Sequence, residues 1–282
     1  MTLPVPKTYK LFVGGKFPRS ESGRSYQPAG NPTLNVARGS RKDLRDAVVA
    51  ARSGLAAWRQ ATGYLRGQIL YRLAEMLSSR RAALVDELRL CGATPAAAQR
   101  EVAAAVDLAV WYAGLCDKLP SLLGSQNGVN GPFFAFSTVE PCGVVGVLAP
   151  DALPLAGMLA LALPLLAAGN AVVALCSERA PCAGLALGEV AASSDVPAGA
   201  LNLLAGHRAE LLAPFASHRE LDGLFAGVPL PADVVALAAD NCKRVRRIEL
   251  PQDGLRDPAR LRGLAFVEPF VETKTLWHPV AP

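Results

Sequence analysis

The sequence contains few of the residues from which most metal and nucleic-acid sites are built. Of the 282 residues, 6% are aromatic and 51% are hydrophobic. The chain has only three histidines. The histidines, His207, His218 and His278, lack the spacing of metal ligands, so we expect no metal site. The composition also excludes disordered, collagen-like and low-complexity chains.

Paired cysteine motifs are absent as well. None of the six cysteines forms a C-x-x-C pair, and most lie in apolar surroundings; they are Cys91, Cys116, Cys142, Cys176, Cys182 and Cys242. This usage is typical of reduced, buried thiols. We therefore expect a cytoplasmic location.

Basic residues exceed acidic ones, with a formal net charge of +5. Most of this charge is arginine dispersed along the chain, with one denser run over Lys243–Arg247. Such a run is usually a solvated face, and no RNA- or DNA-binding motif accompanies it. We expect no nucleic-acid partner.

One uncharged stretch, residues 152–177, is long enough to be tested as a membrane span. Pro154, Pro164 and the pair Gly169-Asn170 interrupt it, which favours a helix, a turn and a buried strand. The first residues, Met1–Pro4, do not begin a basic segment followed by an apolar one, so a secretory signal is not expected. We expect no membrane partner.

The N-terminal half has the patterns of a hairpin followed by helices. Apolar residues flank Gly14-Gly15 within Lys10–Phe17, which predicts a β-hairpin. Ser40 and Asp43 resemble a capping box before a helix that carries Trp58. Further elements are expected as helices at 65–77, 80–90 and 95–116, a loop at 119–131 and a strand at 132–139.

From Gly143 onward, short apolar strands alternate with helices. Strands are predicted at 144–148, 171–175, 201–204, 221–225 and 245–250, and helices near 154–168, 180–192, 207–216 and 231–241. This alternation indicates βαβ units, a parallel sheet covered on both faces and ligands at the carboxyl ends of its strands. The predicted fold class is α/β, with a Rossmann-like parallel sheet flanked by helices.

An ordered series of local matches resembles the NAD(P)-dependent aldehyde dehydrogenase superfamily. Glu140–Val147 (EPCGVVGV) and Leu163–Val173 (LPLLAAGNAVV) are similar to its strand entry and its helix-to-strand segment. The series continues in order through Ser177-Glu178, Pro181, Asp195–Asn202 and Gly206. Flanking matches also fit: Phe12–Phe17, Ala47–Arg52 with Trp58, Arg72–Ala74 and Thr273–Trp277.

The resemblance implies a division of the chain. Residues 1–131 would be the N-terminal hairpin and helices of a cofactor-type domain, and 140–250 its Rossmann-like core. Residues 132–139 and 264–282 would form the strands of an oligomerisation arm. The catalytic domain is absent, because only a short segment separates Leu250 from the closing strand.

The catalytic residues of the family are mostly missing. The asparagine that donates a hydrogen bond to the oxyanion in the family corresponds to Ala152 here. Loss of one such donor lowers the rate roughly 10²–10³-fold. Glu249 aligns with the general base, but Pro251 and Gln252 replace the glycines after it, and the nucleophilic cysteine is absent. Glu249 could equally pair with Arg246 or Arg247. Cys142, Cys176 and Cys242 are expected to be core thiols, with Cys176 the alternative nucleophile.

The cofactor-binding residues survive in part. In the family, the lysine and glutamate of a K-P-S-E motif hold the adenosine ribose. The matching residues here are Leu175–Glu178, which keep the carboxylate and lack the ammonium group. The F-T-G-S segment corresponds to Phe225–Val228, and Pro229 after it removes an N–H near the phosphate position. Glu178, Gly206 and Gly227 remain as cofactor-binding candidates, yet no cofactor is expected and any binding of NAD(P) would be weakened. Structural alternatives exist for each: a first-turn helix residue for Glu178, and turn glycines.

The combination is most similar to the non-catalytic C-terminal domain of family-16 type aldehyde dehydrogenases. It implies a degenerate protein that acts as a structural, assembly or regulatory subunit, either as a homodimer or in complex with a full-length aldehyde dehydrogenase. Two alternatives stay open: an active NAD(P)-dependent aldehyde dehydrogenase, which is an oxidoreductase, and a nucleotide-binding regulatory module.

Overall fold

A five-stranded parallel sheet forms the centre of the protein, with strand order β10-β9-β6-β7-β8. The computed structural model describes residues 7–250 and 257–280, so the expectations for Met1–Pro4 and for Pro251 and Gln252 fall outside it. The strands are β6 (Val144–Leu148), β7 (Ala171–Leu175), β8 (Leu201–Leu204), β9 (Gly223–Ala226) and β10 (Arg244–Arg247). The predicted α/β class is confirmed.

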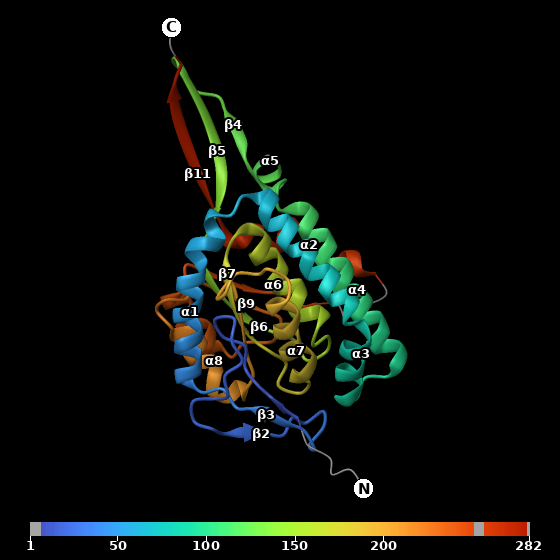
Figure 1. Cartoon of the computed structure of the whole chain (residues 1–282). Coiled ribbons are helices and arrows are strands. Elements are labelled where there is room, and N and C mark those ends of the chain that lie inside the picture. Colours follow the sequence, from blue (N-terminus) through green and yellow to red (C-terminus); the bar gives the residue numbers. More distant parts are fainter. Residues whose placement is uncertain (1–6, 251–256, 281–282) are drawn as a thin grey trace.

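Helices cover both faces of this sheet (Figure 1). On one side α1 (Arg41–Gln60) packs on β7, β8 and α8 (Arg208–Ser217), and α9 (Ala232–Asn241) packs on α8. On the other side lie α6 (Ala156–Ala168) and α7 (Pro181–Ala192). A further layer of α2 (Gly63–Ser79), α3 (Arg81–Leu90) and α4 (Pro95–Leu115) packs over α6 and α7.

Helix α1 begins as its sequence predicts. The Ser40 side chain accepts hydrogen bonds from two backbone N–H groups, and the Asp43 carboxylate accepts from the Ser40 N–H, which completes the capping box. At the other end, the fully buried Trp58 indole donates to the Leu166 carbonyl over 3.0 Å. This bond fixes the N-terminal helix to the end of α6.

Helix α6 is apolar on every side because it is enclosed on every side. All its residues are buried between the sheet and the outer helices. Its C-terminus is the predicted cap, with Gly169 at φ 93° and the Asn170 N–H bonded to the Leu165 carbonyl. Among residues 7–250 and 257–280, no helix is both long and apolar enough to cross a membrane.

The predicted N-terminal hairpin forms as a short one. Gly14 and Gly15 make its turn, with φ of 57° and 75°; Val13 and Lys16 exchange two backbone hydrogen bonds, and the Leu11 N–H donates to the Pro18 carbonyl over 3.1 Å. On its other side, Phe12 pairs with Leu203 of β8, and the buried Phe12 side chain belongs to the main core. The regular strands nearby form a separate small sheet of β1 (Thr8–Tyr9), β2 (Ser25–Tyr26) and β3 (Asn35–Ala37).

A three-stranded antiparallel arm projects from the body (Figure 1). It contains β4 (Ser125–Asn127), β5 (Phe133–Pro141) and β11 (Val271–Pro279), in the order β11-β5-β4. The loop predicted for 119–131 is therefore wrong in part, because it holds the short helix α5 (Leu119–Leu123) and β4. Buried Leu119 and the hydrogen bond from Asn127 to Ser137 order this segment.

The chain between the core and β11 is compact. After β10 and the undescribed residues come three 3₁₀ turns, η1 (Pro258–Leu261), η2 (Leu264–Phe266) and η3 (Glu268–Phe270). Phe266 and Phe270 are buried and their rings contact Phe225 of the central sheet. The arm strand thus begins at Val271, and the residues before it belong to the core.

Candidate functional site

The carboxyl ends of β6 and β8 are joined by an ion pair. Asp151 follows β6, and Arg208 is the first residue of α8 after β8. The Arg208 guanidinium donates from Nη1 to Oδ2 of Asp151 over 2.5 Å and from Nη2 to Oδ1 over 2.9 Å. Nη2 also donates to the Ala149 carbonyl over 2.8 Å. The guanidinium therefore lies across the sheet edge at which ligands of this fold bind.

Further donors hold the Asp151 carboxylate in its ionised form. Ser177, after β7, donates its hydroxyl to Oδ1 over 2.6 Å. Partial burial raises the pKa of Asp151, but the hydrogen bonds from Arg208 and Ser177 and the Arg208 charge outweigh it, so the pKa lies below its usual value. Asp151, Ser177 and Arg208 thus link the ends of three adjacent strands.

Both oxygens of Glu178 are engaged by residues of the same chain. Oε1 lies 2.9 Å from Nδ1 of His207, and Oε2 accepts the backbone N–H of Arg208 over 3.0 Å. The His207 ring in turn contacts the Tyr26 ring, with 4.9 Å between centroids. The expectation that Glu178 lies in the first turn of its own helix is wrong, because α7 begins at Pro181. It caps the N-terminus of α8 instead.

The two candidate glycines are in close contact with protein atoms. A Cβ on Gly206 would lie 2.9 Å from Leu211 Cδ1 and 3.1 Å from the Gly39 carbonyl oxygen. A Cβ on Gly227 would lie 3.0 Å from both Leu161 and Pro150. Packing alone therefore accounts for glycine at both positions.

The segment after β9 offers few backbone donors. It runs through Val228 and Pro229, and α9 begins only at Ala232 with Pro231 as its N-cap residue. Proline has no N–H, so two of the positions before the helix cannot donate to an anion. Val228 is buried, and its side chain belongs to the core.

Glu249 and Ala152 lie in different surroundings. The Glu249 side chain is 81% exposed and pairs with Arg247, one of the two partners considered from the sequence. Ala152 lines a pocket that Glu249 does not line.

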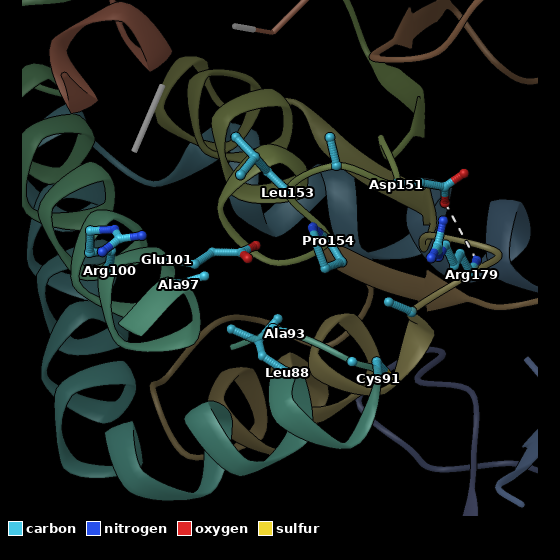
Figure 2. A pocket seen from close by; sticks show the side chains of 13 residues that line it. Leu88, Cys91, Ala93, Ala97, Arg100, Glu101, Asp151, Leu153, Pro154 and Arg179 are labelled. Carbon is cyan, nitrogen blue, oxygen red and sulfur yellow. Dashed lines mark hydrogen bonds between the residues drawn. The ribbon is translucent and has the colours of Figure 1, made fainter. Parts of the chain in front are cut away.

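A pocket near the sheet edge lies between the helical layer and the loop after β6 (Figure 2). Its volume is about 640 Å³, and it is lined by the end of α3, the start of α4, the loop 151–154 and Arg179-Ala180. Two arginines, Arg100 and Arg179, supply its positive charge, whereas Glu101 and Asp151 supply carboxylates. The pocket is thus lined by charged as well as apolar residues.

Glu101 is the most deeply buried carboxylate of this pocket, and it caps α6. Its Oε1 accepts the backbone N–H groups of Leu155 over 2.8 Å and Ala156 over 3.1 Å, while its residue is only 4% exposed. Burial raises the pKa of Glu101, and the two backbone donors offset only part of that effect. The side chain reaches from α4 toward the pocket interior (Figure 2).

The three thiols considered as nucleophiles are packed in the interior. Cys176 is fully buried against Met158, and burial raises its pKa to about 12. Cys142 donates to the Asn170 side chain, and burial raises its pKa to about 12 as well. Burial also raises the pKa of Cys242. All three are protonated at neutral pH and lack the exposed, electropositive setting of a reactive thiol.

Asp151, Arg208 and Glu101 did not stand out in the sequence. Asp151 and Arg208 each lie within four residues of the end of a predicted strand, which is the one signal that could have selected them. Glu101 lies within an alanine-rich helical pattern and carried no signal. Among the described residues, no group of three or more His, Cys, Asp or Glu side chains could hold a metal ion.

The sheet order and the helices on both faces define a Rossmann-like α/β fold. The model of the aldehyde dehydrogenase family matches residues 18–249, so the chain belongs to that family. Retinal dehydrogenase 2 of Homo sapiens is 32% identical over 251 residues, which cover 85% of this chain and 48% of that protein. The counterpart from Gallus gallus is 31% identical with the same coverage.

The fold agrees with solved structures of this family. The NAD⁺ complex of aldehyde dehydrogenase from Bacillus cereus superposes with a TM-score of 0.78 at 24% identity, covering 86% of this chain and 50% of that one. The chain thus spans about half the length of the relatives it matches.

Proposed function

We propose that this chain is a non-catalytic member of the aldehyde dehydrogenase family that acts as a structural or assembly subunit of an aldehyde dehydrogenase. The observation that carries the proposal is that side chains of this chain bind one another at the carboxyl edge of the sheet. There, Arg208 pairs with Asp151. Each oxygen of Glu178 also has a partner, one in His207 and the other in the first N–H group of α8.

The residues at this edge do not fit a dinucleotide bound as the family resemblance implies. The Glu178 carboxylate already accepts a hydrogen bond on each oxygen within the chain, and the matching ammonium group is replaced by buried Leu175. The pyrophosphate would meet Pro229 and Pro231 before α9 instead of free N–H groups. The same edge also carries the fixed Arg208–Asp151 pair.

The catalytic requirements of the family find no match in the described residues. Only residues 248–270 lie between β10 and β11, where the resemblance implies a whole catalytic domain. The buried thiols are protonated, and Ala152 has no donor for an oxyanion. The exposed Glu249 pairs with Arg247 outside the pocket.

The arm supports a role in assembly. Its outer strand β11 pairs on one side only, with β5, and presents Leu276 and Trp277 at 46% and 59% exposure. Phe133 and Phe134 of β5 are exposed beside them, and the Phe133 and Trp277 rings are in contact. An unpaired edge with exposed aromatic residues is a surface that normally binds another chain.

Light scattering tests the proposal, on the purified chain alone and after mixing with a full-length aldehyde dehydrogenase. We expect a mass above that of one chain, either as a homodimer or as a complex with the enzyme. A monodisperse monomer that leaves the mass of the enzyme unchanged would contradict the proposal.

A further inference from the structure

The carboxylate of Glu101 has one oxygen that the protein does not use. Oε1 accepts both N–H groups at the start of α6, whereas Oε2 has no hydrogen-bond partner among residues 7–250 and 257–280. In the same part of the chain, only the Tyr26 and Tyr112 hydroxyls are side-chain polar groups that are fully enclosed without a partner. Oε2 is therefore not sealed in the core, and it is open to a ligand in the pocket that Glu101 lines.

The other carboxylate of this pocket already has its partners. Both oxygens of Asp151 accept from the Arg208 guanidinium, and Oδ1 also accepts from the Ser177 hydroxyl. A cationic group that enters the pocket thus finds its acceptor at Glu101. Because burial raises the pKa of Glu101, a cation at Oε2 also stabilises the ionised form that burial opposes.

Arg179 lines the same pocket with a guanidinium that has no partner. Its backbone is held on both sides, because its N–H donates to Oδ1 of Asp151 over 3.4 Å and its carbonyl accepts the Gly30 N–H over 3.0 Å (Figure 2). The guanidinium itself makes no ion pair or hydrogen bond within the described ranges. Its planar set of N–H donors matches the two oxygens of a carboxylate.

Apolar side chains separate these two charged groups. Figure 2 shows Glu101 and Arg179 on opposite sides of Pro154, with the Glu101 carboxylate directed toward Pro154 and Arg100 on the far side of Glu101. The apolar part of the lining consists of Leu88, Ala93, Ala97, Ala152, Leu153 and Pro154. The pocket volume of about 640 Å³ lies within the range of roughly 300–1,000 Å³ that is typical of small-molecule sites. A ligand that extends from Glu101 along this wall reaches Arg179.

We propose that this pocket binds an ω-amino carboxylic acid, a small zwitterion whose ammonium group donates to Oε2 of Glu101 and whose carboxylate accepts from the Arg179 guanidinium. The methylene chain between the two groups lies against the apolar wall, where it is removed from water. An α-amino acid carries both charged groups on one carbon and engages only one end of the pocket. The site does not include the arm, so its test is independent of the role in assembly.

Isothermal titration calorimetry of the whole chain with 6-aminohexanoate at pH 7 tests this site. We expect saturable binding of one molecule per chain. Hexanoate, hexylamine and glycine, which lack the ammonium group, the carboxylate and the separation between them, should each bind at least about tenfold more weakly, the loss expected from one charge-assisted hydrogen bond. No binding of 6-aminohexanoate, or equally tight binding of any of the other three, would overturn the proposal.

Variants test the two ends of the ligand separately. Glu101→Gln keeps an acceptor for the α6 N–H groups and removes the charge, and Arg179→Gln removes the guanidinium; each should weaken binding of 6-aminohexanoate at least about tenfold. The matched control is Arg81→Gln, which removes an arginine of α3 that does not line this pocket, and it should keep the original affinity within about twofold. Circular dichroism checks that each variant is folded. Full affinity in folded Glu101→Gln or Arg179→Gln, or an equal loss in Arg81→Gln, would contradict the assignment.

Discussion

The Arg208 guanidinium and the Asp151 carboxylate form a two-point ion pair, with Nη1–Oδ2 at 2.5 Å and Nη2–Oδ1 at 2.9 Å. The Arg208 side chain is 18% exposed, so the pair is partly shielded from solvent. Bidentate pairs of this kind are among the stronger charge-assisted hydrogen bonds in proteins. The same pair closes the edge at which this fold binds ligands.

Replacing Arg208 with alanine should destabilise the protein. The change leaves a half-buried carboxylate and the Ala149 carbonyl without their donor, so we expect a loss of about 1–2 kcal/mol in the free energy of unfolding. The matched control is Arg38→Ala, whose Glu210 partner is more exposed, and it should cost less than about 1 kcal/mol. Urea unfolding at pH 7 measures both. Equal losses would show that the Arg208 pair contributes no more than a surface pair.

Acid should remove the contribution of this pair. The pKa of Asp151 is lowered in the folded protein, so its stabilisation is present above the unfolded pKa of about 3.9 and is lost as the pH falls through the lower folded value. The original chain should therefore lose stability below about pH 4 more steeply than Arg208→Ala does. Parallel curves for the two proteins would contradict this origin of the pKa shift.

Glu101 should show the opposite pH dependence. Because its pKa is raised in the folded protein, stability should fall as the pH rises from the unfolded pKa of about 4.3 through the folded value. Glu101→Gln keeps an acceptor for the Leu155 and Ala156 N–H groups but cannot ionise, so its stability should lack this fall. Glu101→Ala removes the acceptor and should cost about 1–3 kcal/mol. Thermal unfolding between pH 4 and 8 measures all three, and identical profiles for the original and Gln variants would refute the assignment.

The arm should control assembly. Deleting residues 271–282 removes the strand that pairs with β5 and should convert any oligomer into single chains. Trp277→Ser should weaken the association, because it removes an exposed aromatic ring from the surface. Leu90→Ser, which removes an exposed apolar residue from α3 instead, is the control and should leave the mass unchanged. Light scattering of the three variants measures the mass, and an unchanged mass after the deletion would show that the arm is not the assembly interface.

Calorimetry separates the assembly role from a nucleotide-binding role. Titration with NAD⁺ and NADP⁺ should give no heat of binding at micromolar protein, since buried Leu175 replaces the ammonium group of the family motif and Pro229 and Pro231 lack N–H donors for a pyrophosphate. The control Glu178→Ala should behave identically. Saturable binding that Glu178→Ala abolishes would instead support a nucleotide-binding module.

Much of the fold was predictable because its signals are local. The bounds of β6, β7 and β8 match the predicted ranges, since each is a short apolar run bounded by turn or polar residues. The capping box at Ser40 likewise depends on neighbours three residues apart. The hairpin at Gly14-Gly15 was predictable for the same reason, because its turn depends on two adjacent glycines.

The site was less predictable because its contacts are long-range. Asp151 meets Arg208, and Glu101 meets the N-terminus of α6, only after the strands and helices are in place. Nothing in the local sequence distinguishes Arg208 from an ordinary residue at the start of a helix. The family resemblance located the positions that had changed, but it could not show which side chains now occupy the sheet edge.

A dehydrogenase assay at 340 nm, with the purified chain, NAD⁺ or NADP⁺ and a panel of aldehydes, tests the central claim most directly. We expect no rate above that of the protein-free blank, because Cys142 and Cys176 are buried and protonated and Ala152 has no donor for an oxyanion. Aldehyde oxidation that disappears in Cys176→Ala or Cys242→Ala, while the Cys116→Ala control retains it, would contradict the account.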